Sequence, residues 1–413
     1  MSDITKKREI VTKKWEIASW CLYDFANSSY SAVISAVVFP VYYANVVVGN
    51  EAGRGDLWWG RAVSLSMLFV ALSSPFIGGI ADRSGLRKKF LALYTFISVT
   101  AVALFSTLRE GSVAEGFFLI LLANIAMEGG LVFYNSFLPG IAEREYQGRV
   151  SAWGFALGYA GSILSLFIAL PLVKRGEFST VWLSVASFFF LFSLPAFFYL
   201  PADRPERGLK ALRAAKEGVR DGFASIKRIW LRDPVIRRFL IAFFLYEDGV
   251  NTIIVFSSIF AAVTFGFSNE ELVALYLLVQ FTALTGALLF ARPIDLWGPK
   301  KVIILSLILW LTVTLAAWFA RDKSAFWAIA ALAGTGLGTV QAASRALYAR
   351  LIPIGKESEY FGVYSMMGKT SAVLGPFLFG TLSAATGSQR PAVLAVGGFF
   401  LLGLMVLMPL RES

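Results

Sequence analysis

One segment of this chain recurs about 214 positions further along, and the second copy keeps the proline, the glycines and the charged residues of the first. The first copy has Pro139, Glu143, Glu145, Tyr146, Gly148, Ser151, Gly154 and Gly161, and the second has Pro353, Glu357, Glu359, Tyr360, Gly362, Ser365, Gly368 and Gly375. Residues 82–88 also return in degenerate form as residues 295–301, and Tyr23-Asp24 returns as Tyr246-Glu247. A duplication of this length predicts two equivalent halves, which is typical of membrane transporters whose site lies between the repeats.

The chain is also too apolar for a soluble protein of 413 residues, with 57% hydrophobic and 16% charged residues. Apolar segments of about 20 residues, the length that crosses a bilayer, can be separated at the polar breaks. They cover residues 19–47, 58–81, 89–108, 116–141, 150–172, 180–200, 237–264, 271–293, 301–320, 324–350, 359–385 and 391–410. Because backbone amides in hydrocarbon must bond within their own segment, we predict an all-α membrane protein with twelve transmembrane helices in two pseudo-symmetric six-helix bundles.

The positive charge follows the predicted topology. The formal net charge is +11, and most of the 38 Lys and Arg residues fall in the N-terminal tail, the even-numbered loops and the C-terminus. By the positive-inside rule, both termini are expected in the cytoplasm, with the protein in a bacterial inner (plasma) membrane. The excess positive charge therefore reflects the orientation of the chain in the membrane. We expect the lipid bilayer as a partner and no binding to nucleic acid.

The predicted domains are a cytoplasmic tail (1–18), an N-terminal six-helix bundle (19–200), a cytoplasmic linker (201–236) and a C-terminal six-helix bundle (237–410). In the linker, Leu212, Val219, Phe223, Ile226 and Trp230 fall on one side of a helix of 3.6 residues per turn. This pattern favours an amphipathic helix at the cytoplasmic lipid surface. A solvated connector is the alternative.

Several activities are excluded because the sequence lacks the residue types that they need. The chain has no histidine and a single cysteine, Cys21, so an internal disulfide, a classical zinc site and a Ser-His-Asp triad are all ruled out. No phosphate-binding glycine loop followed by Lys-Ser/Thr is present. We expect no enzyme activity, no cofactor and no metal, and any proton coupling must use carboxylates.

Polar residues inside the spans are the candidates for a substrate or coupling site, because charge within hydrocarbon is costly and usually faces a cavity or a partner. They fall in spans 1, 4, 7, 10 and 11. The candidates are Asp24, Asn27, Glu128, Asn135, Glu247, Asp248, Asn251, Gln341, Arg345 and Lys369. In span 1, Asp24, Asn27, Ser28, Ser31 and Ser35 recur at helical steps as one polar stripe. The alternative is structural hydrogen bonding between helices, or a permanent pair of Lys369 with Asp24 or Glu128.

Residues 79–88 (GIADRSGLRK) resemble the loop signature of the major facilitator superfamily. Residues 23–28 (YDFANS), 133–139 (FYNSFLP), 154–159 (GFALGY) and 246–252 (YEDGVNT) resemble its vacuole effluxer-like branch. The resemblance implies the major facilitator fold, with helices 1, 4, 7 and 10 around a central cavity. Eukaryotic members are linked to the export of neutral amino acids from vacuoles, so the resemblance also implies export.

A cytoplasmic gate is expected from the two loop motifs. Asp82 and Asp295 can accept hydrogen bonds from the start of a helix in the opposite half, and Gly85 and Gly298 allow tight turns. With their charged neighbours these residues would form a latch that stabilises an outward-open state. The predicted gate is Asp82, Arg83, Gly85, Arg87, Glu143, Arg149, Asp295, Gly298, Lys301, Glu357 and Glu359. Arg83 becomes Leu296, and Pro299 occupies a position that is basic in the loop signature of the superfamily, so we expect the second motif to be the weaker one. The basic residues could also serve only to fix the orientation.

These features together predict a secondary active transporter that moves a small polar solute by alternating access and functions as a monomer. Charges of both signs suit a zwitterion such as an amino acid, and the buried carboxylates suit proton coupling. A multidrug exporter of lipophilic cations is one alternative. A membrane sensor or scaffold that does not transport is another.

Overall fold

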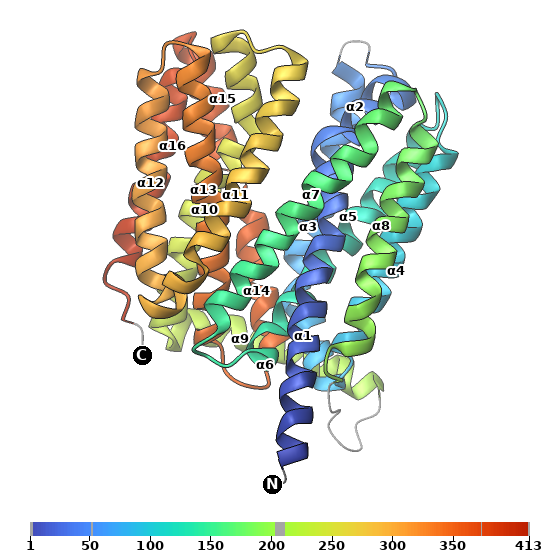
Figure 1. Cartoon of the computed structure of the whole chain (residues 1–413), viewed down its shortest axis with the longest axis vertical. Helices are drawn as coiled ribbons and strands as arrows, with labels where there is room; N and C mark the ends of the chain where they lie inside the picture. The colour runs from blue at the N-terminus through green and yellow to red at the C-terminus, as the bar shows by residue number, and fades with distance from the viewer. Residues whose placement is uncertain (1–2, 51–52, 203–210, 373, 412–413) are drawn as a thin grey trace. The chain divides into compact units, whose positions relative to one another are not determined.

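The computed structural model describes residues 3–50, 53–202, 211–372 and 374–411, and within these ranges every regular element is a helix (Figure 1). The first half contains α1 (Asp3–Ser29), η1 (Tyr30–Val37), α2 (Phe39–Tyr42), η2 (Tyr43–Val48), α3 (Arg54–Ser84), α4 (Arg87–Leu104), η4 (Phe105–Thr107), α5 (Val113–Ser136), α6 (Leu138–Ile141), α7 (Gln147–Lys174) and α8 (Phe178–Tyr199). After α9 (Ala211–Arg232), the second half contains α10 (Pro234–Phe265), α11 (Asn269–Leu296), α12 (Pro299–Phe319), α13 (Lys323–Leu351), α14 (Glu357–Thr370), α15 (Leu374–Thr386) and α16 (Arg390–Leu407).

The prediction of an all-α membrane fold is confirmed, whereas the number of spans stays a prediction. Within the described ranges, ten helices are long and apolar enough to cross a membrane, and a pair bent by 43°, Lys13–Val37 with Phe39–Val48, would be an eleventh. The predicted span 359–385 is divided between α14 and α15, which have 14 and 13 residues. Neither is long enough to cross the bilayer alone, since a span needs about 20 residues.

The first span departs from a regular helix in its second half. Residues Tyr30–Val37 are π-helical, and Pro40 follows in the first turn of α2. A π-helical turn and a proline both interrupt the hydrogen-bond ladder of an α-helix, which accounts for the bend.

The chain forms two compact units that do not follow the two halves of the sequence throughout. The first unit comprises Met1–Glu143, Leu157–Ser225 and Pro353–Ser365, and the second comprises Arg144–Ala156, Ile226–Ile352 and Met366–Ser413. Each unit therefore includes one short segment from the other half of the sequence. The predicted bundle bounds, 19–200 and 237–410, stay a prediction.

Equivalent tyrosines from the repeat occupy the cores of the two units. In the first, the Tyr23 hydroxyl on α1 lies 2.7 Å from Thr95 Oγ1 on α4. In the second, the Tyr246 hydroxyl on α10 lies 2.7 Å from Ser344 Oγ on α13. Each pair joins the first helix of a half to another helix of that half by a buried hydrogen bond. The tyrosines are equivalent in the repeat, whereas their partner helices are not, since α4 is the third predicted span of the first half and α13 is the fourth of the second.

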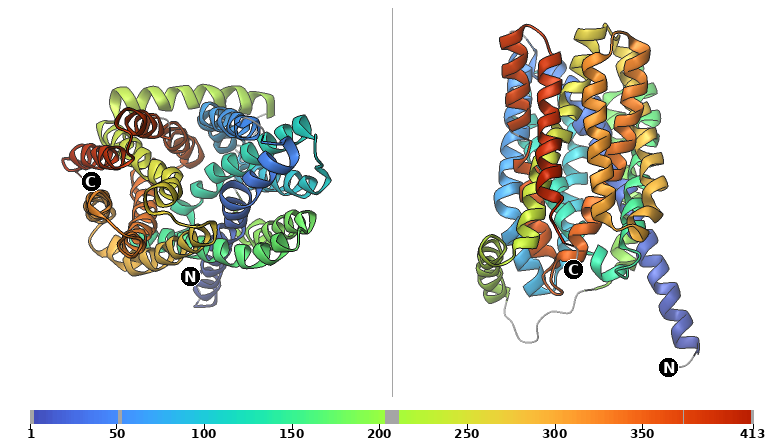
Figure 2. Two further views of the ribbon diagram at one scale, coloured as in Figure 1. Left: turned by 90° about the horizontal axis from the view of Figure 1, so that it is seen from above. Right: turned by 90° about the vertical axis from the view of Figure 1, so that its left-hand side faces the viewer.

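Helix α9 lies within the predicted linker, of which residues 203–210 fall outside the described residues. It crosses α3 at a steep angle; Figure 2 shows α9 side-on where the long helices are seen end-on. The crossing is close, because a Cβ atom on Gly79 of α3 would lie 2.3 Å from the carbonyl oxygen of Gly218. Only glycine allows two helix backbones to approach to this extent.

Candidate transport site and gate

Asp82 lies in the last turn of α3 and caps the start of α14 in the first unit. Its carboxylate accepts hydrogen bonds from the backbone N–H groups of Ser358, at 3.1 Å, and Glu359, at 2.9 Å. The first N–H groups of a helix have no partner within the helix, and the helix dipole favours a negative charge there. Asp82 therefore attaches the segment Pro353–Ser365 to α3.

Other predicted gate residues surround this contact. Arg87 Nη1 lies 3.9 Å from Glu357 Oε2 and donates a hydrogen bond to the carbonyl of Ser136 at 2.8 Å. Arg83 forms an ion pair with Asp221 of α9, and Gly85 ends α3 with a φ of 62°. The exposed Glu143, 3.3 Å from Lys13 Nζ, belongs to a separate surface pair.

Asp295 forms the corresponding contact in the second unit. It accepts hydrogen bonds from the N–H groups of Gly148, at 2.8 Å, and Arg149, at 3.2 Å, in the first turn of α7. It also pairs with Arg149 Nε at 3.3 Å and with Arg350 Nη2 at 3.1 Å. Gly298 has a φ of 90° in the turn that follows, and Lys301 is exposed at the start of α12.

The two contacts differ in charge and in register. Asp295 has two arginine partners, although the second motif has no counterpart to Arg83. That the second motif is the weaker one stays a prediction. In the repeat, Gly148 corresponds to Gly362, yet Asp82 binds Ser358 and Glu359 instead. The shift is four residues, about one helical turn. Arg350 was missed because it ends a predicted span, where basic residues are common.

In the first unit, Tyr30 at the start of η1 contacts the polar residues of α5. Its hydroxyl donates a hydrogen bond to Asn124 Oδ1 at 2.5 Å, and it lies within electrostatic range of Glu128. Asn135 is seven residues beyond Glu128, about 10 Å along the helix axis, so it does not belong to this group. The sequence suggested Tyr30 only as an aromatic residue of the cavity and not as a polar site residue, although a buried tyrosine hydroxyl usually needs a partner.

Asp24 and Asn27 lie further toward the start of α1. Both are buried, at 7% and 3% exposure. Asn27 Nδ2 donates to the carbonyl of Tyr23 at 3.0 Å, while a Cβ on Gly158 of α7 would lie 3.6 Å from Asp24 Cγ. The close approach of α7 therefore covers Asp24.

In the second unit, three polar residues of α10 lie along the break between α14 and α15. Glu247 is within electrostatic range of Lys369, and Asn251 Nδ2 donates to Ser371 Oγ at 3.4 Å. The Asp248 carboxylate accepts from the N–H of Gly375 at the start of α15. One face of α10 thus hydrogen-bonds to Ser371 and to the start of α15, and it lies within electrostatic range of the end of α14.

Arg345 contacts a different segment. Its guanidinium donates to Ser151 Oγ at 3.0 Å and to the Ser151 carbonyl at 2.7 Å, and it lies 3.9 Å above the ring of Phe155. These partners belong to Arg144–Ala156, the segment that Asp295 also binds. Gln341 precedes Arg345 by four residues and lies on the same face of α13.

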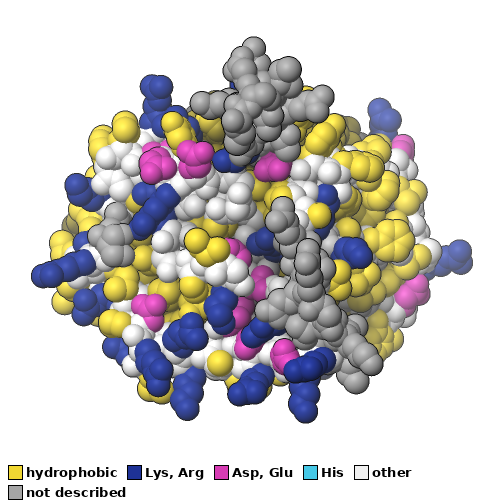
Figure 3. All heavy atoms as spheres, turned by 90° about the horizontal axis from the view of Figure 1, so that it is seen from below, with side chains coloured by type: hydrophobic (Ala, Val, Ile, Leu, Met, Phe, Trp, Pro, Cys, Tyr) yellow, Lys and Arg dark blue, Asp and Glu magenta, His cyan; other side chains and the backbone are white. Residues whose placement is uncertain are grey.

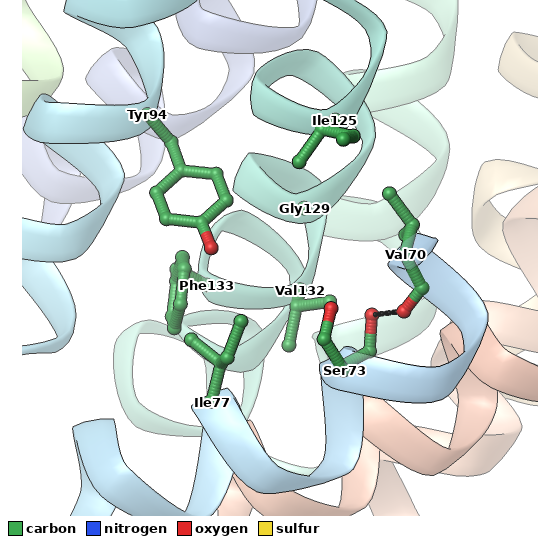
Figure 4. Close-up of a pocket in the computed structure, with 9 residues that line it drawn as sticks. Val70, Ser73, Ile77, Tyr94, Ile125, Gly129, Val132 and Phe133 are labelled. Atoms are coloured by element: carbon green, nitrogen blue, oxygen red, sulfur yellow. Dashed lines mark hydrogen bonds between the residues drawn. The ribbon is translucent and has the colours of Figure 1, made fainter. Parts of the chain in front are cut away.

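The small hollow in Figure 4 contains none of the predicted site residues. It lies between α3, α4 and α5, and its walls are mostly apolar. They are formed by Val70, Ser73, Ser74, Ile77, Tyr94, Ile125, Gly129, Val132 and Phe133. Among the described residues, no group of three His, Cys, Asp or Glu side chains could hold a metal ion.

The fold and the relatives of the chain define its class. It resembles the human organic anion transporter MFSD10 with a TM-score of 0.77 at 15% identity, covering 96% of this chain and 99% of that one. The fucose:proton symporter FucP of E. coli gives 0.72 at 14% identity, covering 98% and 99%. The MFS-type transporter YxiO of Bacillus subtilis, itself uncharacterized, is 28% identical over 94% of this chain and 93% of its own length. The protein is an integral membrane transporter of the major facilitator superfamily, a class without enzyme activity.

The family is narrower than this class. The family model described as "Vacuole effluxer Atg22 like" matches residues 61–413, and the chain belongs to that family. Autophagy-related protein 22 of Saccharomyces cerevisiae is 25% identical over 84% of this chain and 75% of its own length.

Proposed function

We propose that this transporter exports a small zwitterion, such as an amino acid, and couples its movement to protons through buried carboxylates. The observation that carries the proposal is the pair of opposite charges on α10 and α14, where Glu247 lies within electrostatic range of Lys369. A zwitterion offers a carboxylate to Lys369 and an ammonium group to Glu247. Charge of this kind within a span is rarely retained for packing alone.

The polar group of the first unit supports the same solute class. Tyr30 and Asn124 offer neutral hydrogen-bonding groups beside Glu128, which can bind an ammonium group or exchange a proton. Export is supported by the word "effluxer" in the description of the family.

The contacts of Asp82 and Asp295 are proposed to close the cytoplasmic side. Both attach a short segment of one half of the sequence to a helix of the other half. Figure 3 shows Lys and Arg side chains spread over the face that it presents. By the positive-inside rule such a face is cytoplasmic, which favours a bacterial inner membrane with both termini inside.

The test is transport by the purified protein in liposomes. A mixture of labelled amino acids and other metabolites is offered with and without a proton gradient, and the compounds that cross are identified by mass spectrometry. Glu247→Gln and Glu128→Gln are expected to lower transport and flatten its pH dependence. Glu115→Gln, which changes an exposed carboxyl at the start of α5, is the matched control. Unchanged transport and pH dependence in both Glu247→Gln and Glu128→Gln would rule out the coupling role.

A further inference from the structure

Helix α9 has one face that packs on α3 and another that no described part of the chain covers. Gly218, Gly222 and Ser225 are buried, and a Cβ on Gly218 would lie 2.5 Å from Ile80 Cα. Val219 and Phe223 are 36% and 61% exposed. The small residues therefore form the face that approaches the α3 backbone most closely, and the side chains of Val219 and Phe223 lie at its exposed edge.

The uncovered apolar face continues the surface of a membrane span. The ring of Phe223 packs against Phe76 of α3 with centroids 4.5 Å apart. Along α3, Phe76 follows Leu72 and Phe69 at helical steps, and these two residues are 62% and 50% exposed. Helix α3 is long and apolar enough to cross a membrane, so we expect the exposed apolar side chains on this stripe to face acyl chains. Phe223 extends the stripe from α3 onto α9.

Basic residues surround this extension. A hollow on α9 is lined by Arg213, Lys216, Glu217, Val219, Arg220 and Phe223. Glu217 Oε1 lies 2.8 Å from Arg213 Nε, so this acid is matched by one cation while Lys216 and Arg220 add a net positive charge. An apolar floor beside two cations suits a molecule that has both an anionic group and a hydrocarbon chain.

We propose that α9 binds an anionic phospholipid of the surrounding leaflet. Lys216 and Arg220 contact the headgroup phosphate, and Val219 and Phe223 contact the beginning of the acyl chains. The same helix is joined to α3 by the Arg83–Asp221 ion pair, one residue from Asp82. Lipid binding therefore stabilises the packing of α9 on the helix that carries the first gate contact, whatever solute the protein transports.

The test measures lipid selectivity at α9. Ala224, exposed beside Phe223, is replaced by cysteine and labelled with a fluorophore, and the full chain is placed in phosphatidylcholine nanodiscs. A small fraction of either brominated phosphatidylglycerol or brominated phosphatidylcholine is then added as the quencher. We expect the anionic lipid to quench more strongly. Replacing Lys216 and Arg220 together by Gln should lower the relative affinity for it about 30-fold, on the order of fivefold per cation.

Lys227→Gln/Arg228→Gln is the matched control, because it removes the same charge from exposed positions of α9 outside the hollow. It should keep the preference for the anionic lipid. Equal quenching by the two lipids, or a preference that survives in Lys216→Gln/Arg220→Gln, would overturn the proposal. So would the absence of quenching by either lipid, which would make α9 a solvated connector. Size-exclusion profiles confirm that each variant is folded.

Discussion

The carboxylate of Asp248 in α10 accepts hydrogen bonds from the backbone N–H of Gly375, with both oxygens 2.9–3.0 Å from the nitrogen. Gly375 is the second residue of α15, so Asp248 caps a helix that begins inside the predicted eleventh span. A Cβ at this glycine would lie 1.9 Å from Thr252 Oγ1 of α10. The contact makes Asp248 a cap of α15. Its role as a substrate or proton site, expected from the sequence, stays a prediction.

Replacing Asp248 should therefore affect stability first. In Asp248→Ala the N–H of Gly375 loses its acceptor, and loss of a helix cap costs about 0.5–2 kcal/mol. In Asp248→Asn the side-chain oxygen still accepts the hydrogen bond, so most of the stability should remain. Thermal unfolding of the purified variants in one detergent gives the comparison.

The same pair of variants separates capping from proton coupling. If Asp248 only caps α15, Asp248→Asn keeps the pH dependence of transport. An Asn variant with normal unfolding temperature and pH-independent transport would instead make Asp248 a coupling residue.

The two gate contacts should respond independently to substitution. Asp82→Ala removes the acceptor for the N–H groups of Ser358 and Glu359, and Asp295→Ala removes the acceptor for those of Gly148 and Arg149. Hydrogen bonds to a charged group contribute about 1.5–3 kcal/mol, so amide exchange at the released helix start should be roughly 10- to 100-fold faster. Hydrogen–deuterium exchange of peptides from the two helix starts measures this.

We expect the larger loss of stability in Asp295→Ala, because Arg149 and Arg350 both lose an ion pair with a carboxylate whose side chain is only 3% exposed. Each variant is the control for the other. Asp82→Ala should speed amide exchange only at the start of α14, and Asp295→Ala only at the start of α7. Faster exchange at both starts in a single variant would show that the contacts are coupled, against this prediction.

The sequence predicted the fold and the positions of the two aspartates, and it did so through the duplication. A repeated motif must form equivalent turns, so Asp82 and Asp295 were expected to reach the start of a helix in the other half, and the hydrogen bonds have this geometry. That they act as a gate stays a prediction. The one-turn difference in register could not be foreseen, because it depends on where α7 and α14 begin, at Gln147 and Glu357.

The polar residues were harder to place than the fold. The polar stripe of span 1 assumed 3.6 residues per turn through Ser35, but from Tyr30 the helix is π-helical, with more residues per turn. Ser31 and Ser35 are exposed in the structure, unlike Asp24 and Asn27. Partners such as Gly375 for Asp248 are far apart in sequence, and no periodicity within one helix can reveal them.

Two glycines are expected to be essential for packing the segment Pro353–Ser365 against α3. A Cβ on Gly78 would lie 2.2 Å from the Ser358 carbonyl oxygen, and one on Gly362 would lie 2.4 Å from the Ser74 carbonyl oxygen. Gly78→Ala or Gly362→Ala should cost about 1–3 kcal/mol, because neither helix backbone can move without losing contacts. Thermal unfolding and amide exchange in the segment report the loss.

Gly60 is the control on the same helix, since a Cβ there meets nothing within 4 Å. Gly60→Ala should stabilise α3 by about 0.5–1 kcal/mol through its helix propensity. Equal effects of Gly60→Ala and Gly78→Ala would contradict the close packing of α3 and α14.

Glu247 and Lys369 should behave as a coupled pair. Lys369→Met leaves a carboxylate without its neighbouring cation, and Glu247→Gln leaves an ammonium group without its neighbouring acid, so each single variant should be less stable than the parent. The double variant removes both charges and should recover part of that loss. In a double-mutant cycle on unfolding free energies, residues in contact give interaction energies of about 0.5–3 kcal/mol. An interaction energy of zero would mean that the two charges act separately, and Lys369 would then have to be stabilised by another group in its span.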